Sequence, residues 1–239
     1  MWKVLKEVVS TSREEFSSSM LGDDEFHVAE KLNRFFIDSI DELAGSIPAP
    51  LGSFADVHMG GDDCSEVFED ITLNKLSNII TQMKNKSSGD ELLSVALLKS
   101  LFPVIGYPLL NFVNSCLRTA ELPTDLKCSI IIPVPKVNAP KGPVDFRPIN
   151  LLPVLEKVLE IIVYEHLIKF IEKNDILFPF QSGFRKNHSC ESACQLVCTK
   201  WKRDIDKGNI ILGVFVDLKT AFEIVDRERL LVKCERLGI

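Results

Sequence analysis

The chain has 239 residues, enough for one large domain or two small ones, and its 46% hydrophobic and 26% charged residues are typical of a globular protein. No uncharged apolar run approaches the roughly 20 residues of a membrane span, and the N-terminal stretch contains acidic residues and lacks a secretory cleavage signal. We therefore expect neither a signal peptide nor a membrane segment, and an intracellular protein of the cytoplasm or nucleus.

The net charge of −6 is unevenly distributed along the chain. Residues 1–123 hold 10 Lys and Arg against 19 Asp and Glu, a balance of −9, whereas residues 124–239 hold 18 against 15, a balance of +3. A polyanionic partner is therefore expected to contact the second half. Charge alone does not identify a nucleic-acid-binding protein, so that conclusion has to come from motifs.

Seven cysteines at irregular spacing favour a reducing compartment over a disulfide scaffold. Cys190, Cys194 and Cys198 recur at every fourth position, which places them on one face of an expected helix. A single helix can hardly arrange three thiolates around a tetrahedral zinc. We interpret them as buried thiols, with a metal site as the alternative.

The first 120 residues are predicted to be mainly helical. Apolar residues at helical spacing indicate an amphipathic helix within 26–45, and the following stretch 46–66, rich in Pro, Gly, Ser and Asp, is typical of a linker. Further helical patterns occur at 68–83, 91–101 and 109–119. We expect a helical segment and linker over 1–65 and a second helical segment over 66–120.

A hairpin is predicted next. Residues 128–134 are rich in β-branched side chains and include Pro133, which favours an edge strand. A Pro/Gly-rich turn at 138–143 leads into "VDFRPINLL". Lys136 then lies on one arm of the hairpin and Arg147 on the other.

The remaining residues alternate between helices and one strand. An apolar stripe predicts a helix over 151–171, and Ser189 suits the N-cap of a second helix that ends near Ile205. The run from Ile210 to Val216 is apolar apart from one glycine, as in a strand buried on both faces. A last helix is expected over 226–237.

Asp217 ends this apolar run, where an unpaired carboxylate would be costly. One interpretation is an N-cap or ion-pair partner for the segment that follows. The other is a ligand for a divalent cation, because hard cations prefer carboxylate and carbonyl oxygens.

Four stretches carry a family resemblance: "ELPTDLKCSIIIPVPK", "DFRPINLLPVLEKVLE", "FQSGFRKNHSCESA" and "GVFVDLKTAFEIVDRERLL". In this order they resemble the fingers strand, the fingers motif, the next block and the first catalytic motif of reverse transcriptases of non-LTR retrotransposons (LINE-type, jockey-like elements). The resemblance covers about residues 121–239, half of the chain.

The resemblance implies an α+β fold, a partial right-hand polymerase with fingers and the first part of a palm over 121–239. It implies an RNA-directed DNA polymerase that transfers deoxynucleotides to a primer 3′-hydroxyl by two-metal catalysis. The implied partners are an RNA template, a DNA primer and deoxynucleoside triphosphates, and the implied cofactor is Mg²⁺.

The first catalytic motif supplies several implied site residues. By position, Asp217 is the catalytic residue and binds Mg²⁺ together with the backbone carbonyl of Leu218. The amides of Thr220 and Ala221 are implied to lie near the phosphates. Phe222 occupies the steric-gate position, where its ring excludes a ribose 2′-hydroxyl by collision.

Four cations are implied to contact substrates. Lys136 and Arg147 match the positions that hold the triphosphate, for which ammonium and guanidinium groups are well suited. Arg185 and Lys186 match a block near the template path. Without the resemblance, Lys136 and Arg147 are more readily interpreted as solvated surface charges. For Arg185 and Lys186, an ordinary basic loop is as good an interpretation as template contact.

The chain departs from the family pattern at three places. Glu223 stands where aspartate is usual, Cys190 where a residue like Ser or Thr is usual, and the glycine-rich turn expected around Gly89 is altered. Glu223 keeps the charge, whereas the change around Gly89 puts the local fold there in doubt.

The adjacent aspartates that complete such a palm do not follow Asp217 in this sequence. Of the two Asp-Asp pairs, Asp62-Asp63 superficially matches a catalytic "GDD" but is interpreted as part of the linker. We expect a truncated domain that is inactive alone. The alternative is a non-catalytic retrotransposon-derived fragment, either a nucleic-acid- or protein-binding module or a decayed reading frame.

Overall fold

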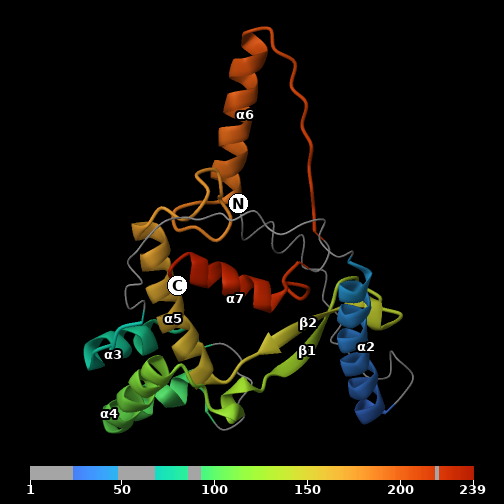
Figure 1. The fold of residues 1–239 in the computed structure, drawn as a ribbon. Coiled ribbons are helices and arrows are strands. Elements are labelled where there is room, and N and C mark those ends of the chain that lie inside the picture. The colour runs from blue at the N-terminus through green and yellow to red at the C-terminus, as the bar shows by residue number, and fades with distance from the viewer. Residues whose placement is uncertain (1–23, 48–67, 86–92, 219–220) are drawn as a thin grey trace, which may run out of the picture. The chain divides into compact units, whose positions relative to one another are not determined.

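The computed structural model describes residues 24–47, 68–85, 93–218 and 221–239 (Figure 1). They form helices and one two-stranded antiparallel sheet, an α+β composition compatible with the expected fold class. The chain divides into two compact units, whose described residues run up to Glu165 and from His166 onward. Asp62-Asp63, Gly89 and the predicted linker beyond Ile47 lie outside the described residues.

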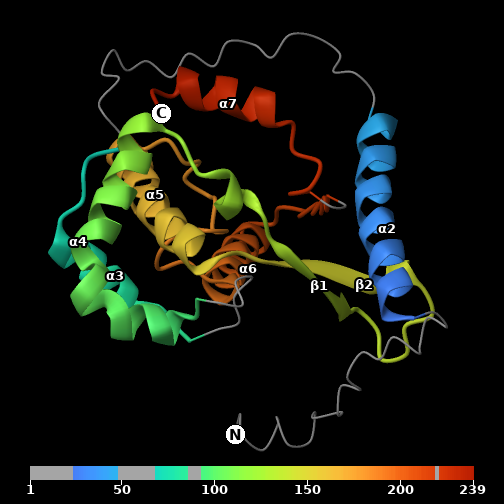
Figure 2. The same cartoon turned by 90° about the horizontal axis from the view of Figure 1, so that it is seen from below.

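The predicted amphipathic helix is confirmed as α2, Glu25–Ser46 (Figure 2). The carboxylate of its N-cap, Asp24, accepts a hydrogen bond of 3.0 Å from the backbone N–H of His27 and so satisfies one of the free amides of the first turn. The buried residues of α2 recur every fourth position and pack with Phe146, which follows more than a hundred residues later: Val28, Leu32 and Phe36.

Helices α3, Leu73–Gln82, and α4, Val95–Thr119, pack against each other in the first unit. We expected separate helices at 91–101 and 109–119, and this prediction was wrong, because α4 continues through Pro103 and Pro108. Both prolines lie on exposed positions, so the carbonyls that lose their N–H partners can be hydrated. The buried stripe on the opposite side continues across them.

Helix α4 has a small residue, Gly106, where it meets α3. Gly106 is buried, and a side chain there would meet Leu73 and the ring of Phe102 at 3.3 Å, so glycine permits the close approach of α3 to α4.

By length and composition α4 could also cross a membrane, which the sequence interpretation missed because it divided the helix at its prolines. Leu98, Leu109 and Val113 of α4 nevertheless contribute to the buried core of the first unit.

The core of the first unit is formed by α3, α4 and the predicted long helix, which is confirmed as α5, Val154–Lys173. Its buried residues follow the apolar stripe of the sequence: Val154, Val158, Leu159 and Ile162. Lys75 of α3 forms an ion pair with Glu165 of α5 at the surface of this core.

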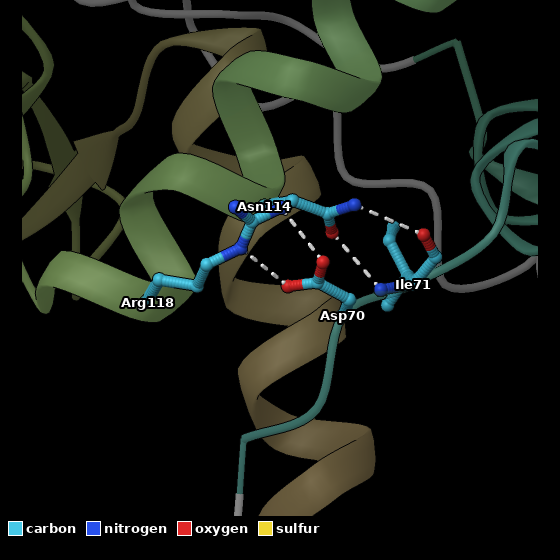
Figure 3. Close-up of polar contacts among 4 residues, drawn as sticks. All are labelled: Asp70, Ile71, Asn114 and Arg118. Carbon is cyan, nitrogen blue, oxygen red and sulfur yellow. Dashed lines mark hydrogen bonds and ion pairs between the residues drawn. The ribbon is translucent and has the colours of Figure 1, made fainter.

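A polar contact inside this core joins α4 to the chain that precedes α3 (Figure 3). The Asn114 side chain accepts a 2.9 Å hydrogen bond from the Ile71 N–H and donates a 3.1 Å bond to the Ile71 carbonyl. One turn later, Arg118 makes a bidentate ion pair with Asp70, at 2.9 and 2.7 Å. The guanidinium keeps the pKa of Asp70 below its ordinary value.

The predicted hairpin is confirmed, with β1 at Ile130–Pro135 and β2 at Phe146–Leu151. A 3₁₀ turn, η2 at Thr124–Lys127, leads from α4 to β1, and a second one, η3 at Pro143–Asp145, precedes β2. The register pairs Ile130 with Leu151 at one end and Pro135 with Phe146 at the other.

The second unit contains α6, Cys190–Asp206, and α7, Arg227–Arg236. Ser189 caps α6 as predicted, and it exchanges hydrogen bonds with Ser192 in a capping box. Asp226 caps α7 through the N–H of Arg229. Neither helix contains a buried residue among those described.

The buried strand predicted at Ile210–Val216 is wrong for this structure. The segment is extended but unpaired, and Ile210, Val214 and Phe215 are 97%, 79% and 86% exposed. The segment runs back alongside α6, since a Cβ atom added to Gly213 would lie 3.6 Å from the ring of Trp201. An apolar run indicates that a segment can be buried, but a strand also needs neighbours, and the described residues provide none.

Replacing Asn114 by alanine should destabilise the first unit by about 2–4 kcal/mol, because the N–H and carbonyl of Ile71 would remain buried without partners. Asn111 is a matched control, because it has the same side chain on the same helix but is exposed. Urea unfolding followed by circular dichroism measures the difference. Equal midpoints for Asn114→Ala and Asn111→Ala would contradict the role of this contact.

Glu156 should make stability depend on pH in the opposite direction from Asp70. Burial, and then the like charge of Glu160, raises the pKa of Glu156, and its Oε2 atom has no hydrogen-bond partner among the residues that the structure describes. The contribution of the Glu156 carboxyl to the free energy of unfolding is therefore fully present below its unfolded pKa, near 4.5. This contribution is lost as pH rises through the higher folded pKa.

Glu156→Gln should accordingly raise the melting temperature at neutral pH and have little effect at pH values below the unfolded pKa. Glu172→Gln, an exposed change on the same helix, serves as the control. Thermal melts across this pH range test the expectation. A Glu156→Gln chain that is less stable than the parent at neutral pH would show that the carboxylate is stabilising.

Candidate functional site

Lys136 and Arg147 lie on the same face of the hairpin. Arg147 pairs with Val134, and the Lys136 N–H extends the ladder with a 2.7 Å hydrogen bond to the Asp145 carbonyl. Directly opposed residues of an antiparallel pair project to the same side, and so do residues two apart on one strand. The register therefore brings together two cations that are separated by ten residues of turn and strand.

The two cations differ in their present contacts. Lys136 donates a 2.8 Å hydrogen bond from Nζ to the Val144 carbonyl, whereas the guanidinium of Arg147 makes no hydrogen bond or ion pair to the described residues. Both are exposed. The guanidinium is thus available for an anionic ligand with two coplanar oxygens, and the ammonium is held nearby with two further N–H groups.

The rest of this hairpin face is apolar. By the same register it carries Ile130, Ile132, Val134 and Ile149, of which the three isoleucines are 41–44% exposed. The opposite face carries Phe146, which is buried with the residues of α2. Helix α2 thus packs at the face that carries Phe146, and the face with the two cations stays accessible.

Asp217 lies in the exposed extended segment rather than at the end of a buried strand, so its expected burial is corrected. Its carboxylate has no hydrogen bond or ion pair to the described residues, and Leu218 is 70% exposed. No group of three or more His, Cys, Asp or Glu that could hold a metal occurs in the described part of the chain. These residues do not by themselves fit a two-magnesium centre.

The residues after Asp217 are described in part. Thr220 lies outside the described residues, and Ala221 is half-buried. Phe222 is 75% exposed, and its ring meets that of Phe184 edge to face, with centroids 5.8 Å apart. This contact joins two of the family-like motifs, "FQSGFRKNHSCESA" and "GVFVDLKTAF", in space.

The backbone of Phe184 is unusual. Its φ of 60° lies in the left-handed region, which costs about 1–2 kcal/mol for a residue with a side chain. A bulky residue held there is uncommon, and such conformations persist where the surroundings hold them and often mark functional sites. Sequence reasoning did not single out Phe184, because a backbone angle leaves no signal in a single sequence.

Arg185 and Lys186 follow Phe184 in the same loop. The Arg185 guanidinium is 3.5 Å from the Phe178 carbonyl, at the limit of a hydrogen bond. Lys186 is exposed, and its carbonyl lies 3.1 Å from Nδ1 of His188. The loop therefore folds back on itself, with Lys186 exposed and Arg185 half-buried.

The same loop carries an aromatic pair that sequence reasoning missed. The rings of Phe178 and Phe180 have centroids 5.5 Å apart, and Lys200 of α6 lies with Nζ 6.0 Å from the Phe180 centroid. The interleaving of aromatic and basic residues in "FPFQSGFRK" was the available signal.

The interpretation of Cys190, Cys194 and Cys198 as buried thiols was wrong. All three are exposed on α6, and none forms a disulfide. Helical spacing correctly placed them on one face, but spacing cannot tell whether anything covers that face.

Comparison with known proteins identifies relatives but no matching family model. The chain is 28% identical over 170 residues to an RNA-directed DNA polymerase from mobile element jockey of Drosophila melanogaster, covering 70% of this chain. It is 30% identical over 149 residues to the "Probable RNA-directed DNA polymerase from transposon X-element" of the same fly, covering 62% of the chain. The jockey polymerase of Drosophila funebris is 28% identical over 171 residues.

These matches confirm the resemblance to reverse transcriptases of non-LTR retrotransposons. The chain spans only 16–18% of the length of these relatives. The comparisons thus support a reverse-transcriptase-like region, and the activity of the whole proteins is not transferred by similarity alone.

Proposed function

We propose that this chain is a fingers and partial-palm region of an RNA-directed DNA polymerase of a non-LTR mobile element. The observation that carries the proposal is the hairpin register, which puts Lys136 and Arg147 on one accessible face. The similarity to the polymerases of jockey and X-element supports it. An RNA template, a DNA primer, deoxynucleoside triphosphates and an intracellular location belong to the same proposal.

The hairpin face suits a nucleoside triphosphate. Arg147 would bind two phosphate oxygens in a bidentate manner, and Lys136 would add a mobile point charge. The partly exposed isoleucines beside them offer an apolar surface for a base. One face of the hairpin would thus offer two cations to the triphosphate and an apolar surface to the base of the same nucleotide.

In this proposal Phe222 discriminates between sugars. Its ring is not part of a core, and Phe184 supports it edge to face. A ring held in this way can occupy the space that a 2′-hydroxyl would need, and it rejects ribonucleotides by collision rather than by a lost hydrogen bond.

Asp217 would contribute a carboxylate, and Leu218 its carbonyl, to a magnesium site whose other ligands lie outside the described residues. The ion would polarise the phosphates of the incoming nucleotide and the primer hydroxyl. The amides of Thr220 and Ala221 would lie near the phosphates, and Arg185 and Lys186 near the template.

Arg147→Ala should weaken binding of dATP about 10- to 100-fold, because a charged hydrogen-bonding partner of the triphosphate contributes about 1.5–3 kcal/mol. Arg147→Lys should recover only part of this, since an ammonium cannot bind in a bidentate manner. Arg227→Ala removes an exposed arginine from α7 and is the control. Isothermal titration with dATP and Mg²⁺ provides the affinities, and equal losses for Arg147 and Arg227 would refute the site.

Phe222→Ala should reduce the preference for dATP over ATP, because the space occupied by the ring would admit the 2′-hydroxyl. The ratio of the two dissociation constants, measured by competition, is the readout, since the two ligands differ only in this hydroxyl. Phe215→Ala, a change of another exposed ring nearby in sequence, should leave the ratio unchanged. An unchanged ratio in Phe222→Ala would remove the gate from the proposal.

A further inference from the structure

The loop between α5 and α6, residues 174–189, which we call the aromatic loop, holds Phe184 in a conformation that burial does not explain. Phe184 is 81% exposed, so no core fixes its ring. Its φ of 60° lies in the left-handed region, where a bulky side chain is rare and costly. Glycine would adopt the same angle without this cost, so what Phe184 supplies at this position is its ring.

Hydrogen bonds on both sides of Phe184 hold this backbone conformation. The Gln181 side chain donates a 3.2 Å hydrogen bond from Nε2 to the Gly183 carbonyl, whose carbon is one of the four atoms that define φ of Phe184. After Phe184, the His188 N–H bonds the Arg185 carbonyl at 3.3 Å. The direction of the Phe184 ring is therefore set by the backbone of the loop rather than by packing in a core.

The ring directed in this way lies against Phe222. The two centroids are 5.8 Å apart and the ring planes are 84° apart, an edge-to-face geometry that stabilises aromatic pairs. Phe222 is itself 75% exposed, and among the described residues it meets no other aromatic ring. In the described part of the chain, Phe184 is therefore the ring that can restrain Phe222.

A ring that excludes a hydroxyl by collision has to stay in place when the hydroxyl approaches. Exposed side chains change rotamer within picoseconds to nanoseconds, so an unrestrained ring would turn aside instead of rejecting the ligand. A second ring packed against it disfavours the rotamers that break the contact. Discrimination between sugars then depends on this restraint as well as on the excluding ring.

We infer that Phe184 is a positioning residue for sugar selection. It restrains the Phe222 ring and so sharpens the preference for deoxynucleoside triphosphates over ribonucleoside triphosphates. Phe184 acts through Phe222 and needs no contact with the nucleotide. The inference rests on the proposed role of Phe222 and extends sugar selection to a residue of the aromatic loop.

The test is the ratio of the dissociation constants of ATP and dATP, measured by competition on the full chain with Mg²⁺. Phe184→Ala should lower this ratio about 2- to 10-fold, the strength of an aromatic pair expressed as a change in affinity. The change should come from tighter binding of ATP, with the affinity for dATP unaltered, because Phe184 acts on the gate and not on the ligand. Phe184→Tyr keeps the ring and should retain the ratio of the parent.

Two further variants separate the ring contact from the backbone and from the rest of the loop. Phe184→Gly removes the ring without the strain that alanine retains at a φ of 60°, and it should lower the ratio as Phe184→Ala does. Phe180→Ala removes another exposed ring of the aromatic loop, one that meets Phe178 instead of Phe222, and should leave the ratio unchanged.

A doubly substituted chain decides whether Phe184 acts through Phe222. In the Phe222→Ala background, Phe184→Ala should change the ratio no further. Equal effects of Phe184→Ala in both backgrounds would overturn the inference, and so would an unchanged ratio in Phe184→Ala when Phe222→Ala lowers it. The gate at Phe222 would stand in both cases. An unchanged ratio in Phe222→Ala would instead refute the gate itself, and the positioning role with it.

Discussion

The pairing of the Asn114 side chain with both backbone polar groups of Ile71 is the contact on which the first unit depends. It fixes the entry into α3 against the C-terminal part of α4, and it does so inside the core, where an unpaired amide would be costly. The hairpin emerges from this core at both ends, because β1 follows α4 through η2 and β2 continues into α5. The Lys136–Arg147 face is thus connected at both ends to the helices of the core.

The two units differ in the burial of their apolar residues. In the first, α3, α4 and α5 bury a continuous cluster, and α2 covers the Phe146 side of the hairpin. In the second, α6, α7 and the segment 210–218 contain no buried residue among those described, although several of their side chains are large and apolar. The second unit therefore presents surface that partners can cover, and both Asp217 and the aromatic loop belong to it.

The candidate functional residues of the two units differ in how far their surroundings are defined. In the hairpin, the register set by backbone hydrogen bonds places Lys136 and Arg147 on one face. The ring contact between Phe184 and Phe222 unites two motifs that are 38 positions apart. Around Asp217, by contrast, the described residues hold no group of three or more His, Cys, Asp or Glu that could bind a metal, so the proposed magnesium site needs ligands beyond them.

The sequence by itself determined the features that depend on local periodicity and on turn chemistry. The stripes of α2 and α5, the Ser189 cap and the Pro/Gly turn of the hairpin all follow from interactions between residues close in the chain. Tertiary structure decided whether a segment with a suitable local pattern became a continuous helix or a buried strand. Helix α4 continues through Pro103 and Pro108 because its buried side packs in the core, and Ile210–Val216 is exposed because no strand among the described residues pairs with it. It also paired Asn114 with Ile71 and Phe184 with Phe222, because burial and long-range contacts depend on partners that no local window of sequence contains.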